Sequence, residues 1–254
     1  MRLLVLAAAF ALAACEPASA PRPDEAPAAS PAAPAAQTGQ IDLDSLKGRI
    51  VALGRDPEWR LDADAQLGII LVMPEQGLTF SSDFTAPQRT ADGGARLADP
   101  PIALTLTREA CTLNGAPYPM GASAQIENGE PLIGCAFVRW DWRLIEMLPA
   151  IDACIALSPQ TRIVTYAAIE DAGRVLVRLH GEGASPRDCH APLTADGAPA
   201  IILPSDATLL IAGDGDAIFV RAPGQNPGGD CYEAPEVRAA DGSLLGWMDD
   251  PLGC

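Results

Sequence analysis

Cysteine spacing is the feature that most constrains the fold of this chain. Six of the seven cysteines lie beyond residue 110, at Cys111, Cys135, Cys154, Cys189, Cys231 and Cys254. An even set of cysteines predicts disulfides in an oxidising compartment and thiols or metal ligands in a reducing one. No C-x-x-C pair occurs, and the only histidines are His180 and His190. Because zinc sites draw on closely spaced cysteine and histidine, we expect no metal site and no cofactor.

The first fifteen residues predict an exported protein. Arg2 is followed by ten apolar residues, Leu3 to Leu12, and then by the small residues Ala13 and Ala14. This is the layout of a secretory signal peptide. Ten residues are too few to cross a bilayer, because a membrane-spanning helix needs about 20. We therefore expect residues 1–14 to be a signal peptide and the later cysteines to meet an oxidising compartment.

The sequence Leu12-Ala13-Ala14-Cys15 resembles the lipobox of bacterial lipoproteins. In that family the cysteine thiol carries diacylglycerol, the signal is cut before it, and fatty acyl groups such as palmitate hold the protein on the bilayer. Two or three acyl chains make a stable anchor, whereas one binds only marginally. The resemblance implies lipidation of Cys15 and a periplasm-facing location in the cell envelope, and Glu16 favours the outer over the inner membrane. The alternative is an ordinary cleaved signal followed by a chance cysteine.

Assigning Cys15 to lipid leaves six cysteines, and counting alone leaves fifteen pairings open. We expect nearest neighbours to pair: Cys111 with Cys135, Cys154 with Cys189, and Cys231 with Cys254. Each bridge would close a loop of about 20 to 35 residues, worth roughly 3 to 4 kcal/mol on the chain-entropy model.

The charge of the chain excludes some classes of partner. Removing residues 1–14 deletes Arg2 and no acid, so 17 − 1 = 16 basic residues face 33 acidic residues. Nucleic acids and anionic membrane faces are held by clusters of Lys and Arg, so neither is expected as a partner. A cationic envelope protein would suit this charge. A solvated acidic surface that keeps an exported protein soluble is the favoured explanation of this charge.

Composition predicts the domain organisation. Residues 16–40 hold nine Ala and six Pro, which predicts a disordered tether over 15–40 behind the lipidated cysteine. The 24 Pro and 23 Gly of the chain favour short strands and turns over long helices. We predict a mainly β fold with two small antiparallel barrel-like or sandwich-like modules, at 41–137 and 151–254, joined by a short helical connector at 138–150.

Local patterns place the expected elements. Residues 67–73 read as a buried strand, 102–107 as a strand with one buried face, and 162–168, 174–179, 208–211 and 217–220 as further strands. Tight hairpin turns are expected at 114–115, 128–129 and 213–216. Asp141 can cap a helix that Pro149 ends. A Val-Arg to Asp-Cys pattern at 177–189 recurs at 220–231, which suggests an internal repeat, although chance similarity also explains it.

Two further segments resemble a group of uncharacterised bacterial envelope lipoproteins. Gly54-Arg55-x-x-Glu58-Trp59-x-Leu61 is similar to that group's R-G-x-E-P-x-W-x-L opening. Cys111-x-Leu-Asn114-Gly115-Ala-x-Tyr118-Pro119, followed by Gly134-Cys135-Ala136, is similar to its C-x-D-x-M-S-G-x-x-Y-P and G-C-A signature, with Gly-Ala in place of Met-Ser. The resemblance covers residues 48–136 and implies no reaction. A possible binding surface on these motifs comprises Arg55, Glu58, Trp59 and Tyr118.

Few residues of the sequence are candidates for catalysis or for metal or glycan binding. Asp214 and Asp216 lack the further oxygen ligands of a calcium loop, which favours a turn. The two histidines have no serine placed by motif beside them, so we expect them to be structural. The four tryptophans could line a glycan groove, and core filling is the more general role. We therefore predict no catalytic residues.

These observations predict a non-enzymatic envelope lipoprotein with a binding or structural role and an unknown partner. The alternative is an inhibitor of a cationic hydrolase such as lysozyme, for which an acidic, disulfide-bonded protein is suited by charge steering. Hydrolysis of an envelope polymer is less favoured, because the sequence offers no nucleophile or metal constellation.

Overall fold

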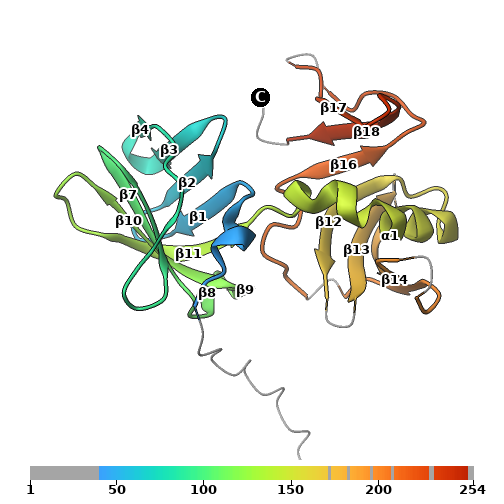
Figure 1. The fold of residues 1–254 in the computed structure, drawn as a ribbon, viewed down its shortest axis with the longest axis horizontal. Helices are drawn as coiled ribbons and strands as arrows, with labels where there is room; N and C mark the ends of the chain where they lie inside the picture. Colours follow the sequence, from blue (N-terminus) through green and yellow to red (C-terminus); the bar gives the residue numbers. More distant parts are fainter. Residues whose placement is uncertain are drawn as a thin grey trace, which may run out of the picture. The chain divides into compact units, whose positions relative to one another are not determined.

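The computed structural model describes residues 40–170, 173–181, 184–194, 197–206, 209–228 and 232–250. The expected signal peptide, Cys15, almost all of the tether, Cys231 and Cys254 lie outside these residues. The described chain is mainly β, as predicted, and forms two larger antiparallel sheets (Figure 1). Within the described residues, no helix is long and apolar enough to cross a membrane.

The first sheet is antiparallel throughout, in the order β4-β3-β2-β1-β11-β10-β7-β6-β5. Its strands are β1 (Ile50–Gly54), β2 (Trp59–Asp64), β3 (Gly68–Met73), β4 (Leu78–Ser82), β5 (Gln88–Arg89), β6 (Ala95–Asp99), β7 (Ile102–Thr107), β10 (Met120–Ile126) and β11 (Leu132–Val138). The sheet curls until its ends approach. The backbone N–H of Asp83, just after β4, donates to the Asp99 carboxylate at 3.1 Å, and that of Ala98 donates to Thr85 Oγ1 at 3.1 Å.

Alternating burial builds the core of this curled sheet. In β2 and β7 every second side chain is buried, as the period of a strand requires. The prediction of a fully buried strand at 67–73 is wrong for one face. Ile69 and Leu71 are fully buried, but Ile70 is 37% exposed and Val72 36% exposed. The reason is that the first core covers only one face of β3, and successive side chains of a strand point to opposite faces.

Short elements complete this half of the chain. Two 3₁₀ helices, η1 (Leu43–Leu46) and η2 (Pro74–Gln76), precede and interrupt the first sheet. Strands β8 (Cys111–Leu113) and β9 (Ala116–Tyr118) form a separate hairpin. Its turn residues Asn114 and Gly115 have φ values of 54° and 80°, so the predicted Asn-Gly turn is confirmed.

The second sheet has the order β15-β14-β13-β12-β16-β18-β17. Its strands are β12 (Ile163–Ile169), β13 (Arg174–Gly181), β14 (Ala184–Pro192), β15 (Ile201–Pro204), β16 (Ile218–Arg221), β17 (Glu236–Arg238) and β18 (Leu244–Asp249). Helix α1 (Leu144–Leu157) crosses β12, β13 and β14 in Figure 1 and buries Met147, Ile151 and Cys154 in the core of this sheet. The helix therefore belongs to the second core rather than acting only as a connector.

Two disulfides connect elements, and both pairings were predicted. Cys111–Cys135 joins β8 to β11, and Cys154–Cys189 joins α1 to β14, with Cα–Cα distances of 5.5 and 5.8 Å. The third expected pair, Cys231 with Cys254, lies outside the described residues and stays a prediction.

The helix differs from the prediction at both ends. A 3₁₀ turn, η3 (Trp140–Arg143), leads directly into α1, and no side chain caps the start of α1. Pro149 lies inside the helix instead of ending it. Proline removes the hydrogen bond to the carbonyl four residues earlier, that of Ile145. The Ile145 side chain is 57% exposed, so this side of the helix faces solvent, which can hydrate the carbonyl.

Two local predictions are wrong. The loop between β10 and β11 spans five residues, and Glu127 rather than Asn128 takes a positive φ, of 50°. The Glu127 N–H donates to the Pro101 carbonyl at 2.7 Å, which draws the loop away from a tight hairpin. Residues 209–211 form no strand. Both edges of β16 are occupied, by β12 and β18, so no edge remains for this segment beside it.

The suggested repeat stays a prediction. Arg178 and Asp188 pair across the β13–β14 hairpin, whereas the corresponding Arg221 pairs with Asp152 of α1. The counterpart of Asp188, Asp230, lies outside the described residues.

Candidate functional site

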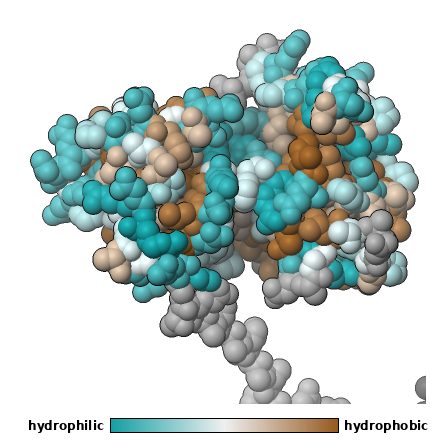
Figure 2. Space-filling model, in the orientation of Figure 1, coloured by the Kyte–Doolittle hydropathy of each residue, from teal (hydrophilic) through white to brown (hydrophobic). Residues whose placement is uncertain are grey.

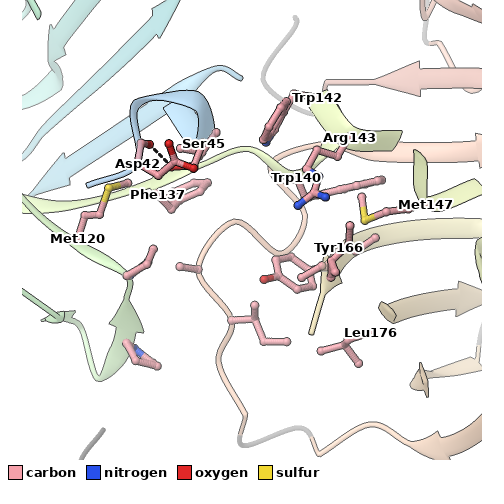
Figure 3. Close-up of a pocket in the computed structure, with 18 of the residues that line it drawn as sticks. Asp42, Ser45, Met120, Phe137, Trp140, Trp142, Arg143, Met147, Tyr166 and Leu176 are labelled. Atoms are coloured by element: carbon pink, nitrogen blue, oxygen red, sulfur yellow. Dashed lines mark hydrogen bonds between the residues drawn. The ribbon is translucent and has the colours of Figure 1, made fainter. Parts of the chain in front are cut away.

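One cavity of the described fold has a volume of about 780 Å³ (Figure 3). It is lined by the segment before η1, by β10 and β11 of the first sheet, by η3 and α1, and by β12, β13 and residues 209–212. Pockets of about 300 to 1,000 Å³ with mainly apolar walls hold small ligands. This cavity is therefore our candidate site.

Apolar side chains form its opposing walls. Met120 and Phe137 lie on one side in Figure 3, and Met147, Tyr166 and Leu176 lie on the other. The walls combine aromatic rings, which offer large rigid surfaces, with methionines, which adapt to irregular shapes. Figure 2 shows apolar side chains between polar ones on the visible face of the molecule. The lining residue Trp142 is 40% exposed, and Leu209 and Leu210 are about half exposed.

Local packing fixes the aromatic side chains. The indole N–H of the buried Trp140 donates to the Ala217 carbonyl at 3.2 Å. A Cβ atom on Gly213 would lie 2.6 Å from the Phe137 ring, so this ring packs directly on the 213–216 turn. A Cβ on Gly48 would lie 2.5 Å from Trp142, which places that ring on the backbone near η1. Glycine is needed at both positions because the rings approach the backbone so closely.

Few polar groups enter the cavity. The Tyr166 hydroxyl is turned toward it in Figure 3, and burial raises the pKa of this phenol, with the Asp214 carboxylate adding to the effect. Asp42 uses its carboxylate to accept the Asp44 N–H at 3.0 Å, and Ser45 donates its hydroxyl to the Asp42 carbonyl at 2.6 Å. These contacts form the N-terminal turn of η1.

Arg143 lies at the mouth of the cavity. Its Nε donates to Glu146 at 2.8 Å and its Nη2 donates at 2.7 Å, while its guanidinium carbon lies 5.6 Å from the Trp142 ring centre. The guanidinium hydrogen bond lowers the pKa of the Glu146 carboxyl, so this pair is ionised at neutral pH. Arg108 also lines the cavity and donates to the Gln40 carbonyl at 2.9 Å.

The four residues of the predicted binding surface do not meet on one surface. Arg55 and Glu58 are exposed on the turn between β1 and β2, and Arg55 donates to the Asn114 side chain. Trp59 is 1% exposed and belongs to the first core, so its assignment to a binding surface is wrong. Tyr118 is half-buried, with its ring centre 6.0 Å from that of Phe137.

Other candidates have structural surroundings. Trp59, Trp140 and Trp247 are buried, which agrees with the core-filling interpretation, whereas Trp142 is not. His190 Nδ1 lies 2.8 Å from Glu170. Asp214 accepts from Thr165 and Arg178. Residues 212–216 form a turn, but it is not the predicted hairpin turn, because no strand precedes it at 209–211. Among the described residues, no group of three His, Cys, Asp or Glu side chains is placed to hold a metal ion.

Sequence reasoning missed the cavity because its lining comes from seven separated segments. One signal was present. Trp142-Arg143 puts a large aromatic and a cation at the exposed start of a helix. Comparison with known proteins adds no assignment: no family model, curated protein or solved structure matches this chain.

Proposed function

We propose that this chain is a lipid-anchored envelope lipoprotein that binds a small ligand with a large apolar part, without catalysing a reaction. The observation that carries the proposal is the cavity of about 780 Å³ with aromatic and aliphatic walls. Apolar surface that stays uncovered in a soluble protein commonly marks a binding site.

The cellular setting of the proposal comes from the sequence. Cys15 would carry the acyl chains, and the Ala/Pro tether would hold the folded part away from a bilayer, facing the periplasm. The two disulfides support an oxidising compartment. Glu16 favours the outer membrane, and the motif residues between 48 and 136 would relate the chain to other envelope lipoproteins.

Dye binding tests the cavity. The full chain with Cys15→Ser, purified without lipid, should enhance the fluorescence of the neutral dye N-phenyl-1-naphthylamine. Ala168→Phe, which adds a ring at the cavity wall, should weaken this binding at least tenfold. Ala103→Phe, on strand β7 and away from the cavity lining, is the matched control and should leave binding unchanged. Unaltered binding in Ala168→Phe, or none in the parent protein, would contradict the proposal.

Membrane fractionation tests the anchor separately. Cys15→Ser should release the protein from the membrane fraction of the producing bacterium, because it removes the thiol that carries the diacylglycerol. Retention of this variant in membranes would refute the lipid anchor and leave the cavity proposal standing.

A further inference from the structure

We propose that the ligand of this cavity is a single-chain anionic amphiphile, whose carboxylate or phosphate binds at Arg143 and whose hydrocarbon chain fills the apolar interior. This inference rests on the proposed function, because it assigns a ligand class to the same cavity. Three features support it: the charged residues of the lining, the hydrogen-bond donors of Arg143, and the separation of polar from apolar lining residues.

The lining of the cavity is less acidic than the chain as a whole. Acidic residues outnumber basic ones by 33 to 17 in the sequence, yet the charged residues that line the cavity are Arg108, Arg143 and Asp42. The Asp42 carboxylate is already hydrogen-bonded to the Asp44 N–H. Two of the three charged lining side chains are therefore guanidinium groups, and one of them, Arg143, can attract an anionic headgroup that an acidic lining would repel.

The geometry of Arg143 leaves donors for a ligand. Its Nε and Nη2 bind Glu146, and no described residue accepts a hydrogen bond from its Nη1. Glu146 binds one edge of the guanidinium, and the Trp142 ring centre lies 5.6 Å from the guanidinium carbon. The side chain extends toward the space between Phe137 and Tyr166 in Figure 3. A positioned guanidinium binds carboxylate and phosphate through charge-assisted hydrogen bonds.

The remainder of the cavity suits a hydrocarbon chain. Polar groups of Asp42, Ser45 and Arg143 lie toward one end in Figure 3, and Leu176 lies toward the other. Met120 and Met147 line opposite walls and can adapt to a flexible chain. Each buried methylene contributes about 0.8 kcal/mol, so affinity should rise roughly fourfold per methylene until the cavity is full.

Competition with the neutral dye distinguishes the headgroups at constant chain length. The probes are dodecanoate, dodecyl phosphate, dodecanol and dodecyltrimethylammonium, each below its micelle concentration and added to the full chain with Cys15→Ser. We expect dodecanoate or dodecyl phosphate to displace the dye at concentrations at least tenfold lower than dodecanol, and the cation to be the weakest. The better of the two anions identifies a fatty acid or a phospholipid-derived ligand.

Substitution at the mouth tests the assigned residue. Arg143→Gln should reduce the ratio of anion affinity to dodecanol affinity by roughly tenfold, because a hydrogen bond to a charged group is lost. Arg238→Gln removes another exposed arginine, which pairs with Glu236 and does not line the cavity, and should leave this ratio unchanged. Equal binding of anion and alcohol, stronger binding of the cation, or an unchanged preference in Arg143→Gln would overturn the inference. Dye binding without this selectivity leaves the proposed function intact, whereas failure of every probe and the dye contradicts both.

Discussion

Trp59 fills space in the first core that two glycines leave open. A Cβ atom on Gly54 would lie 1.9 Å from the Trp59 indole nitrogen, and one on Gly134 would lie 1.9 Å from the Leu53 carbonyl oxygen and 2.8 Å from the indole ring. Both glycines lie in the centre of the sheet, on β1 and β11. The close approach of the strands around this ring therefore depends on the absence of side chains at both positions.

Gly134→Ala should destabilise the protein by roughly 1 to 3 kcal/mol. The added methyl group meets a backbone carbonyl that strand pairing holds in place, so relief requires movement of β1 or β11. Urea denaturation followed by tryptophan fluorescence measures the loss. Gly224→Ala is the matched control, because its Cβ would meet nothing closer than 3.8 Å. Equal stability of the two variants would show that the sheet adapts to the methyl group.

The burial of Trp59 was readable from the sequence, although its assignment to a binding surface was wrong. Trp59, Leu61 and Ala63 alternate with polar residues at 60, 62 and 64, which is the period of a half-buried strand. The motif resemblance predicted a binding role for Trp59, whereas the alternation predicts a buried one. The two glycines opposite the ring come from other strands, and their role depends on pairing that a single sequence does not specify.

At the level of elements, the two disulfides differ in exposure. Cys154 and Cys189 are both fully buried between α1 and β14. Cys135 is buried, but Cys111 on the small β8–β9 hairpin is half-buried. The two loops are of similar length, with separations of 24 and 35 residues, so their chain-entropy contributions differ little.

Under native conditions, mild reductant should therefore open Cys111–Cys135 before Cys154–Cys189. Reduction requires a thiolate to reach a sulfur atom, and the hairpin offers that access without unfolding of a core. Timed alkylation with peptide mass spectrometry measures the order. Under denaturing conditions the difference should largely vanish, which serves as the control. Earlier opening of Cys154–Cys189 would mean that α1 detaches more readily than the β8–β9 hairpin.

Most strands could be predicted from periodicity, whereas one predicted strand and the end of the helix were wrong. Strands β7, β12, β13 and β16 lie close to their predicted ranges because branched and apolar residues concentrate there. Residues 209–211 have similar composition but form no strand, and both sides of the neighbouring β16 are already paired, with β12 and β18. Pro149 was predicted to end the helix, because proline usually terminates helices. The helix continues past it, because Met147 and Ile151 on either side are buried in the core. Both errors arise from long-range contacts.

At the scale of the whole molecule, a chain of ion pairs connects the two sheets. Arg49 binds Asp62 and Asp250, each at 3.0 Å, and Arg60 binds Asp62 at 2.7 Å and Asp216 at 3.6 Å. Asp62 belongs to the first sheet, whereas Asp216 precedes β16 and Asp250 follows β18. The candidate cavity draws its walls from both sheets, so these pairs help to hold its walls together.

Two aspartates should give opposite pH dependences. Burial raises the pKa of Asp216, and Arg60 partly opposes this effect. The contribution of Asp216 to the free energy of unfolding is therefore favourable at low pH and is lost as pH rises through the raised pKa. Burial acts to raise the pKa of Asp188 as well, but hydrogen bonds from Arg178 bring it below the ordinary value. The contribution of Asp188 to the free energy of unfolding is therefore present at neutral pH and lost as pH falls through its lowered pKa.

Asp216→Asn should accordingly become more stable relative to the parent as pH rises from about 4 toward neutrality. Asp188→Asn should be less stable than the parent at neutral pH, and this deficit should shrink as pH falls below the ordinary aspartate pKa. Urea denaturation across a pH series measures both differences. If the stability difference from the parent changed with pH in the same direction for both variants, the opposite pKa shifts of Asp216 and Asp188 would be contradicted.

Arg139 offers the sharpest test of coupling between the sheets. It is 5% exposed, follows β11, and binds Asp141 at 2.9 Å and Asp250 at 3.0 Å. Arg139→Met should cost roughly 3 kcal/mol, because it leaves carboxylates without this partner in a partly buried position. Asp250→Asn alone should also destabilise, and the double variant should lose about 1 to 3 kcal/mol less than the sum of the two.

The same variants should reveal whether the sheets unfold together. If the ion pairs couple them, peptides from β2 and β13 exchange backbone hydrogens in one cooperative opening in the parent protein and in separate openings in Arg139→Met. Hydrogen exchange with mass spectrometry distinguishes these patterns. Arg238→Gln, which breaks a pair within the second sheet, is the control and should preserve the shared opening. Additive energies in the double-mutant cycle, together with unchanged exchange, would assign the coupling instead to the apolar contacts of Phe137 and Trp140 with residues 213–217.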